Sequence, residues 1–418
     1  MTFSTIVVAF VAFSLAVATI PEGLTAVVAF TLAMPAAGIQ IAGEGVGYFE
    51  APITLGGDLP ETAPAPSRQL VIDPEYEAMM RRHSEAEARR WENVRQAREE
   101  IALMAPGLRA ASPWSGLSTV GDTMTLKVYA GGNTCSGTYS AINTVVRYIG
   151  TSAIYIEDTA NPLTESFTAA EYAAWDATLS GTTLPTIKNY FGEFLDSIPR
   201  GGVVGDTLGL DADGRVGVII TKETNKLETY VGFVNPMDLY ATSLCPTSNQ
   251  AEVFYGIAPD PAGLYAFGAK TKAEVAALMP MLIAHEVTHI LQGTQDTFRG
   301  AASKAVWETE GGATLAEQLV GNAVLGHGGS GQNLGLDEFL QGYFGDQWYR
   351  SWAIDLRTYF GLTSINAPEE CTWLEKNNDG PCWSGRAVYG VPATLLRFIL
   401  DWYGPSYTGG EAALMRDL

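Results

Sequence analysis

The sequence predicts an α+β fold, in which a β-rich N-terminal subdomain is followed by a helical C-terminal subdomain. Between residues 118 and 260, short β-prone runs alternate with turn residues, which is the pattern of a twisted sheet. In residues 261–418, apolar residues recur at helical spacing, most clearly in residues 273–291 and 391–402. We therefore expect the β-rich half to wall one side of a cleft and the helical half to form its floor.

Four runs in the β-rich half carry the strand prediction. They are Met124–Tyr129, Thr144–Tyr148, Ala153–Glu157 and Val216–Thr221. The segment 210–215 contains Asp211 and Asp213 and so resembles the start of a calcium loop, but Gly214 falls two positions too early for an EF-hand. A tight turn into the following strand explains this segment better.

The residues before the sheet divide into three segments by composition. Residues 1–48 form an apolar leader or membrane segment, in which residues 6–34 are long enough to cross a bilayer with a kink. Residues 49–72 are rich in Pro and Gly and predict a linker, and residues 73–108 predict a charged helix, either a propeptide or a spacer. We therefore expect a bacterial protein that is secreted or membrane-anchored, outside the cytoplasm.

Residues 14–34 resemble the cation-binding transmembrane helix of P-type ATPases, because they contain its Pro-Glu-Gly-Leu turn. The chain has no Asp-Lys-Thr-Gly phosphorylation loop, so ion transport is dismissed. No Lys or Arg precedes Arg68, so the positively charged start of a standard signal peptide is also missing.

The net charge limits the class of binding partner, and the cysteines bear on whether the protein forms disulfides. The chain has 25 Lys plus Arg against 46 Asp plus Glu, and the net charge of −21 argues against nucleic acid as a partner. Its four cysteines have no C-x-x-C spacing. Two interpretations stay open: two disulfides, of which Cys371–Cys382 would staple a loop, or four buried thiols.

The motif His285-Glu286-Val287-Thr288-His289 lies inside the predicted helix 273–291. Two histidines four residues apart share one helix face, where both can bind a single zinc ion. Glu286 stands beside that face and is placed to take a proton from a water that the metal activates. The alternative is a chance motif on a packed helix; with only four histidines in the chain, its probability is on the order of a few in a thousand.

A catalytic zinc site needs a third protein ligand and an open position. Gln292 and Gln295 occupy positions at which the metzincin pattern requires Gly and His, so that pattern fails. Asp296 follows the motif so closely that the chain has little room to turn back. Glu310 is the better candidate, and Glu308 is the fallback.

The segment Trp307–Gly311, followed by a helix with Glu317, resembles the zinc-ligand helix of gluzincin peptidases. The resemblance implies that Glu310 is the third zinc ligand and that Glu317 orients a ligand histidine. With looser matches between residues 118 and 404, it indicates the hyicolysin-like branch of HExxH zinc metallopeptidases and a zincin-like fold. The chain lacks a Gly-x-Met-Glu-Asn segment and has Thr314 where thermolysin-like enzymes have Asp, which disfavours aminopeptidases and that subgroup.

The same resemblance implies two further roles. Substrate peptides of gluzincins add to a sheet edge before the zinc helix, and residues 249–255, with Asn249 and Ala251, are placed to be that edge. An ordinary core strand is the alternative. Tyr389, just before the predicted helix 391–402, is expected to stabilise the oxyanion. The alternatives for this role are His327, Tyr343 and Tyr349.

The sequence therefore predicts a zinc-dependent metalloendopeptidase that acts on protein or peptide substrates, with Glu286 as the general base. Two other functions stay open. One is a non-catalytic surface or adhesion module that keeps a peptidase-like fold, and the other is a zinc hydrolase of a non-peptide amide.

Overall fold

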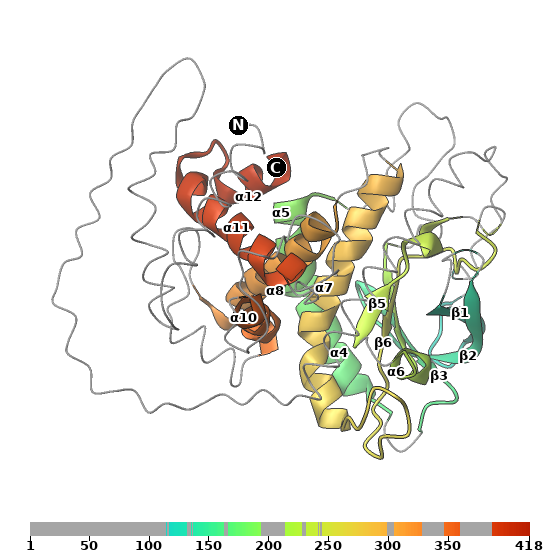
Figure 1. Ribbon diagram of the computed structural model, residues 1–418. Helices are drawn as coiled ribbons and strands as arrows, with labels where there is room; N and C mark the ends of the chain where they lie inside the picture. The colour runs from blue at the N-terminus through green and yellow to red at the C-terminus, as the bar shows by residue number, and fades with distance from the viewer. Residues whose placement is uncertain are drawn as a thin grey trace, which may run out of the picture.

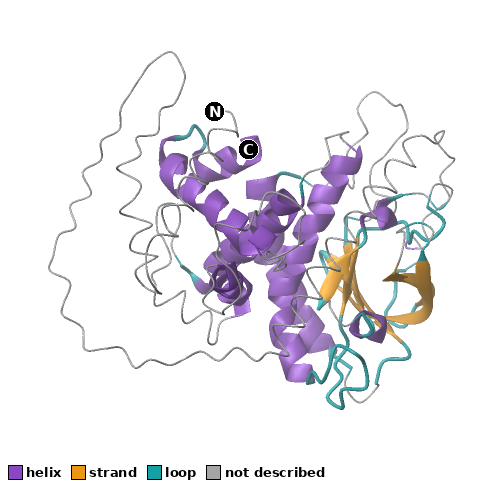
Figure 2. Ribbon diagram, in the orientation of Figure 1, coloured by secondary structure: helices purple, strands orange, loops and turns teal. Residues whose placement is uncertain are grey.

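The computed structural model describes most of the chain from Trp114 to Leu418. The described residues are Trp114, 117–131, 135, 137–162, 166–193, 214–227, 231–240, 242, 245–298, 305–327, 347–359 and 387–418. A six-stranded sheet lies on one side of the long helix α7 (Lys272–Phe298), and a group of helices lies on the other (Figure 1; Figure 2). The α+β prediction is confirmed, whereas the segments predicted at 1–48, 49–72 and 73–108 lie outside the described residues.

The sheet has the strand order β1-β2-β3-β4-β6-β5. Its strands are β1 (Thr123–Gly131), β2 (Thr138–Ile149), β3 (Ala153–Asp158), β4 (Val216–Ile220), β5 (Gly232–Val234) and β6 (Val253–Gly256). The first three strands are antiparallel, β4 is parallel to β3 and β6, and β5 is antiparallel to β6. Every residue of β3, β4 and β6 is buried, as expected for strands covered on both faces. The four predicted strands are confirmed, since they overlap β1 to β4.

Gly214 has a φ of 72°, in the left-handed region that glycine tolerates without steric cost, and β4 begins two residues later. This backbone agrees with the predicted turn into the strand. The remainder of the segment that resembles a calcium loop, residues 210–213, lies outside the described residues.

The sheet curls so that β1 returns toward the loop that precedes β6 (Figure 1). The side chain of Asn249 makes the connection, because its Oδ1 accepts from the Lys127 backbone nitrogen at 2.9 Å and its Nδ2 donates to the Lys127 carbonyl at 2.7 Å. Trp114 packs inside the curled sheet. Its Nε1 donates to the Asn249 carbonyl, and a Cβ on Gly217 would lie only 2.4 Å from its ring. Asn249 therefore supports the fold of the sheet.

The prediction that residues 249–255 form a sheet edge is wrong. β6 begins at Val253 and lies between β4 and β5, so both of its sides are hydrogen-bonded to other strands. Asn249 and Ala251 precede it in a buried loop, where the Ala251 backbone nitrogen donates to the Asp238 carbonyl at 3.0 Å. Because β5 precedes β6 in the chain but lies outside it in the sheet, the order of predicted strands does not reveal the edge.

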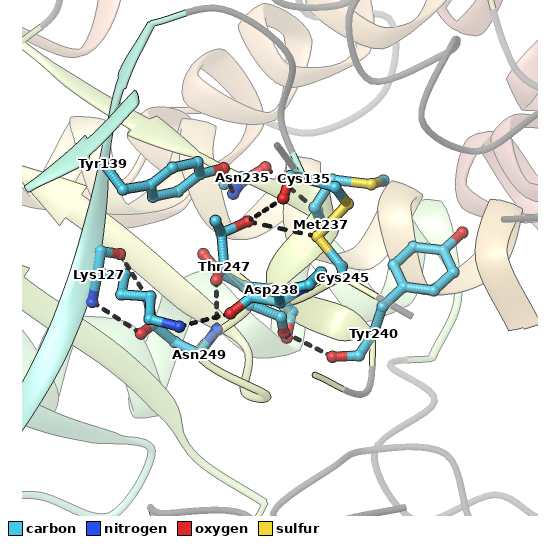
Figure 3. Close-up of a disulfide and its surroundings, with 12 residues drawn as sticks. Lys127, Cys135, Tyr139, Asn235, Met237, Asp238, Tyr240, Cys245, Thr247 and Asn249 are labelled. Atoms are coloured by element: carbon cyan, nitrogen blue, oxygen red, sulfur yellow. Dashed lines mark hydrogen bonds between the residues drawn. A yellow bond between two sulfur atoms is a disulfide. The ribbon is translucent and has the colours of Figure 1, made fainter. Parts of the chain in front are cut away.

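A disulfide joins Cys135, between β1 and β2, to Cys245 in the loop before β6 (Figure 3). The neighbouring Asp238 carboxylate accepts from the Asn249 backbone nitrogen and from the Tyr255 hydroxyl, both at 2.7 Å. Burial raises the pKa of Asp238 to about 7, although these donors act in the opposite direction. One disulfide is thus present, whereas the predicted pair Cys371–Cys382 lies outside the described residues.

The helical half is built around α7. The other helices among its described residues are α8 (Val306–Leu325), α10 (Gln347–Tyr359), α11 (Ala387–Tyr403) and α12 (Gly410–Asp417), with a short 3-10 helix η8 (Gly404–Ser406). α7 contacts β5 and β6 on one side and α8 on the other, and α8 in turn packs on α11. The sequence predicted that α7 ends at Gly293, but the helix continues to Phe298, and Thr294 in this added stretch is buried.

The β-rich half also contains helices that the strand pattern did not reveal. α4 (Ala169–Thr178), the π-helical turn η4 (Leu179–Thr183) and α5 (Leu184–Phe191) follow β3, and α6 (Lys222–Asn225) and the 3-10 helix η5 (Pro236–Leu239) flank β5. α5 contacts α8 and α12, and the Tyr190 hydroxyl donates to the Glu411 carboxylate. A helix from before residue 260 is therefore part of the helical half in space.

Within the described residues, Lys272–Asp296 of α7 is long and apolar enough to span a membrane by composition. However, 67% of its apolar window is buried inside the protein, and residues such as Met279 and Ile283 belong to the core shared with the sheet. Core packing accounts for its hydropathy. The membrane segment predicted at residues 6–34 lies outside the described residues.

Candidate metal centre

Three predicted ligands, His285 and His289 on α7 and Glu310 on α8, converge in the described part of the chain. The two Nε2 atoms are 3.1 Å apart, and Glu310 Oε2 lies 3.4 Å from His285 Nε2 and 3.2 Å from His289 Nε2. The helix periodicity brings the two imidazoles to one face of α7, and α8 packs on α7 so that the Glu310 carboxylate lies beside them. The three side chains can therefore hold one metal ion.

The geometry and the donor types fit a tetrahedral zinc ion. With Zn–N bonds of about 2.0–2.1 Å, tetrahedral angles separate ligand atoms by about 3.3–3.4 Å. The three separations here range from 3.1 to 3.4 Å. Two imidazoles and one carboxylate are also the donor set of catalytic zinc sites that keep a fourth position open. Calcium and magnesium prefer oxygen ligands, so the two nitrogen donors disfavour them.

Both histidines are held from behind through their Nδ1 atoms. His285 Nδ1 lies 2.6 Å from Glu317 Oε1, and His289 Nδ1 lies 3.0 Å from Gln292 Oε1. Because both partners present acceptor oxygens, each imidazole in its neutral form keeps its proton on Nδ1 and has its lone pair on Nε2, the atom at the metal position. The predicted contact between Glu317 and a ligand histidine is thus present.

The charges of the ligand side chains and of their acidic neighbours favour a cation between the ligands. Burial alone lowers the pKa of His285, but Glu310 and Glu317, with a smaller contribution from Glu286, outweigh it and hold the pKa well above 6.5. Burial likewise raises the pKa of Glu310, yet His289 and His285 hold it well below its usual range. A metal ion must therefore compete with protons for the site, so its affinity should fall as the pH falls.

Glu286 and Tyr389 both lie beside His285. Glu286 is 5% exposed, and at 100° per residue it stands about 60° around α7 from His289. The ring centroids of Tyr389 and His285 are 6.3 Å apart, with an angle of 21° between the planes. Tyr389 was expected before the last long helix, but it lies inside the first turn of α11, because that helix begins at Ala387.

The alternative residues have other contacts. The Glu308 carboxylate accepts from the Ala305 backbone nitrogen at 2.7 Å and so caps α8. Tyr349 donates to Asn322 Oδ1 at 2.7 Å, and its ring stacks on His327.

Neither Glu308 nor Asp296 belongs to the converging group found among the described residues, and Tyr343 lies outside those residues. Asn249 contacts Lys127 on β1, and Ala251 contacts Asp238; neither belongs to the converging group found among the described residues.

Two adjacent glycines allow α8 to approach its neighbours at the ligand position. A Cβ on Gly311 would lie 2.4 Å from Pro392 Cβ on α11, and a Cβ on Gly312 would lie 2.9 Å from Gln292 Nε2 on α7. Real Cβ atoms do not approach other heavy atoms this closely. The two glycines therefore allow the turn of α8 that carries Glu310 to pack closely against both α7 and α11.

We predict that Gly311→Ala destabilises the protein and that Gly293→Ala stabilises it. A Cβ at Gly293 would meet Leu239 Cδ1 at 3.4 Å, an ordinary contact, so the gain in helix propensity of about 0.5–1 kcal/mol should remain. At Gly311 the rigid Pro392 ring cannot move aside, and the overlap should cost about 1–3 kcal/mol. Urea unfolding of the two variants would measure both signs; equal effects would contradict the close packing of α8 on α11.

Sequence reasoning missed one residue of the site. Gln292 entered only as a mismatch to the metzincin pattern, yet its side chain contacts His289. The spacing could have revealed this contact, because Gln292 follows His289 by three residues and residues three apart in a helix lie on one face.

Comparison with known proteins adds no assignment. No protein-family model matches the sequence, and no curated protein matches it either. The case for a function therefore rests on the side chains of the site.

Proposed function

We propose that this chain is a zinc-dependent endopeptidase with a zincin-like fold. One observation carries the proposal: His285, His289 and Glu310 converge within metal-binding distance, with Glu286 adjacent to the ligands on the same helix. A zinc that only stabilised the fold would need no acid–base group beside it. The presence of Glu286 in this position therefore favours hydrolysis over a structural site.

Zinc, when bound by these three side chains, supplies a Lewis acid that polarises the scissile carbonyl and makes the attacking water more acidic. Glu286 accepts the proton of that water as the water oxygen bonds to the carbonyl carbon. The carbon–nitrogen bond then breaks, and Glu286 returns the proton to the departing amine. Glu317 and Gln292 keep the two imidazoles in place throughout.

We assign Tyr389 to stabilisation of the oxyanion, since its ring stacks on that of the ligand His285. Tyr389→Phe should lower kcat roughly a hundredfold with little change in zinc content, because one hydrogen-bond donor to the developing charge is lost. Tyr349→Phe is the matched control: it removes the tyrosine hydroxyl that donates to Asn322, and its ring stacks on His327, which follows α8. Full activity in Tyr389→Phe would remove the assignment.

The test of the function is zinc-dependent cleavage by the full-length chain. The protein is stripped with a chelator, reloaded with zinc, and incubated with casein and a peptide library whose products are identified by mass spectrometry. Internal cleavages that disappear with the chelator and return with zinc are expected. Bound zinc without any cleavage would instead support a non-catalytic surface module or a hydrolase of non-peptide amides.

We also propose that the enzyme works outside the cytoplasm. The disulfide between Cys135 and Cys245 supports this location, because such bonds persist in oxidising compartments. Sequencing the mature N-terminus of protein recovered from the producing cell would separate the two forms of export: loss of residues 6–34 indicates secretion, and their retention indicates a membrane anchor.

A further inference from the structure

We propose that Gln292 is a positioning residue of the metal centre, which fixes His289 and ties it to the turn of α8 that carries Glu310. Gln292 Oε1 lies 3.0 Å from His289 Nδ1, and Gln292 Nε2 donates to the Thr309 carbonyl at 3.1 Å. The side chain is 3% exposed, so water competes little for either bond. The inference deepens the proposed function and rests on it.

The two bonds determine each other. A carbonyl oxygen only accepts hydrogen bonds, so the amide nitrogen of Gln292 must face Thr309 and its oxygen must face His289. His289 Nδ1 must then carry the proton. The tautomer that points a lone pair from Nε2 at the metal position is thereby selected before any ion arrives.

The bridge also connects the two helices that supply ligands. Thr309 directly precedes Glu310, so one side chain links the second histidine on α7 to the backbone beside the carboxylate on α8. This link resists separation of His289 Nε2 from Glu310 Oε2, which lie 3.2 Å apart. Gly312 provides the necessary space, because any Cβ there would press on the Gln292 amide.

The two ligand histidines are supported by groups of different charge. His285 is bonded to the carboxylate of Glu317, whereas His289 is bonded to the neutral amide of Gln292. Glu310 and Glu317 already balance a divalent ion. A third carboxylate behind His289 would make the imidazole a stronger electron donor and so weaken the Lewis acid that hydrolysis needs. An amide orients the ring without this effect.

The test compares Gln292→Leu with Gln295→Leu in the full-length chain. Gln295, one turn further along α7, makes the same type of bond, from Nε2 to the Phe191 carbonyl at 2.8 Å, but contacts no ligand. Zinc affinity is measured by competition with a chromophoric chelator, and unfolding of the metal-free variants is measured in parallel. We expect Gln292→Leu to bind zinc about 10–100-fold more weakly, and Gln295→Leu to stay within about threefold of the wild type.

Gln292→Glu separates the two bonds, because it keeps an acceptor for His289 but loses the donor to Thr309. It should recover most of the zinc affinity and show a lower kcat than the wild type, and the visible spectrum of its cobalt-substituted form should shift. If Gln292→Leu binds zinc as tightly as Gln295→Leu does, Gln292 is only a packing residue and this inference fails alone. If the wild type binds no zinc, both this inference and the proposed function fail.

Discussion

Glu286→Gln should lower kcat for peptide cleavage roughly 10²- to 10⁴-fold while the protein still binds zinc. The amide has the size of the carboxylate but cannot accept the proton of the attacking water. Zinc binding should persist because the converging ligand atoms belong to His285, His289 and Glu310. Steady-state cleavage of a fluorogenic peptide, together with the metal content of the same sample, measures both effects.

The matched control for this variant is Glu274→Gln in the first turn of α7. Glu274 is exposed, and its carboxylate accepts from the Thr271 backbone nitrogen at 2.8 Å, well away from the ligands in the chain. This control should keep full activity. A Glu286→Gln enzyme as active as Glu274→Gln would show that another group is the base.

Glu310→Gln should weaken zinc binding by about a thousandfold or more, beyond the 10–100-fold expected for residues that only support a ligand. The substitution replaces an anionic donor with a neutral one of equal volume in a buried position. It also removes the negative charge of Glu310. His289 and His285 stabilise that charge and hold the pKa of Glu310 well below its usual range, although burial raises it. Equilibrium dialysis against zinc measures the loss.

Glu308→Gln is the control, because Glu308 lies only two residues earlier on α8 and caps the helix through Ala305. It was also the fallback ligand from the sequence. Retention of zinc by Glu308→Gln and its loss from Glu310→Gln are expected. The reverse result would move the third ligand to Glu308 and contradict the geometry described here.

The ligand positions could be predicted because their cause is local. An i, i+4 spacing places His285 and His289 on one helix face whatever the surrounding fold. Glu310 was predicted from the resemblance of the segment Trp307–Gly311 to a known ligand helix. The strands β1 to β4 were predictable for the same reason, since alternating or continuous apolar runs set their type locally.

Features that depend on distant parts of the chain could not be predicted in this way. The place of β6 inside the sheet is decided by pairing with β5, and the partner of Cys135 lies 110 residues away at Cys245. Tyr389 was predicted to precede the last long helix, but α11 begins two residues before it, at Ala387, and packs on α8. The spacing could have placed Gln292 beside His289, but its bond to the Thr309 carbonyl depends on how α8 packs on α7.

The most direct test of the metal centre is anomalous X-ray diffraction at the zinc absorption edge from crystals of the full-length chain grown with zinc. A zinc site formed by these ligands predicts one strong anomalous peak within about 2.0–2.2 Å of His285 Nε2, His289 Nε2 and a Glu310 carboxylate oxygen. Zinc peaks only at other positions, or none in a crystal whose protein shows these three side chains well ordered, would contradict it.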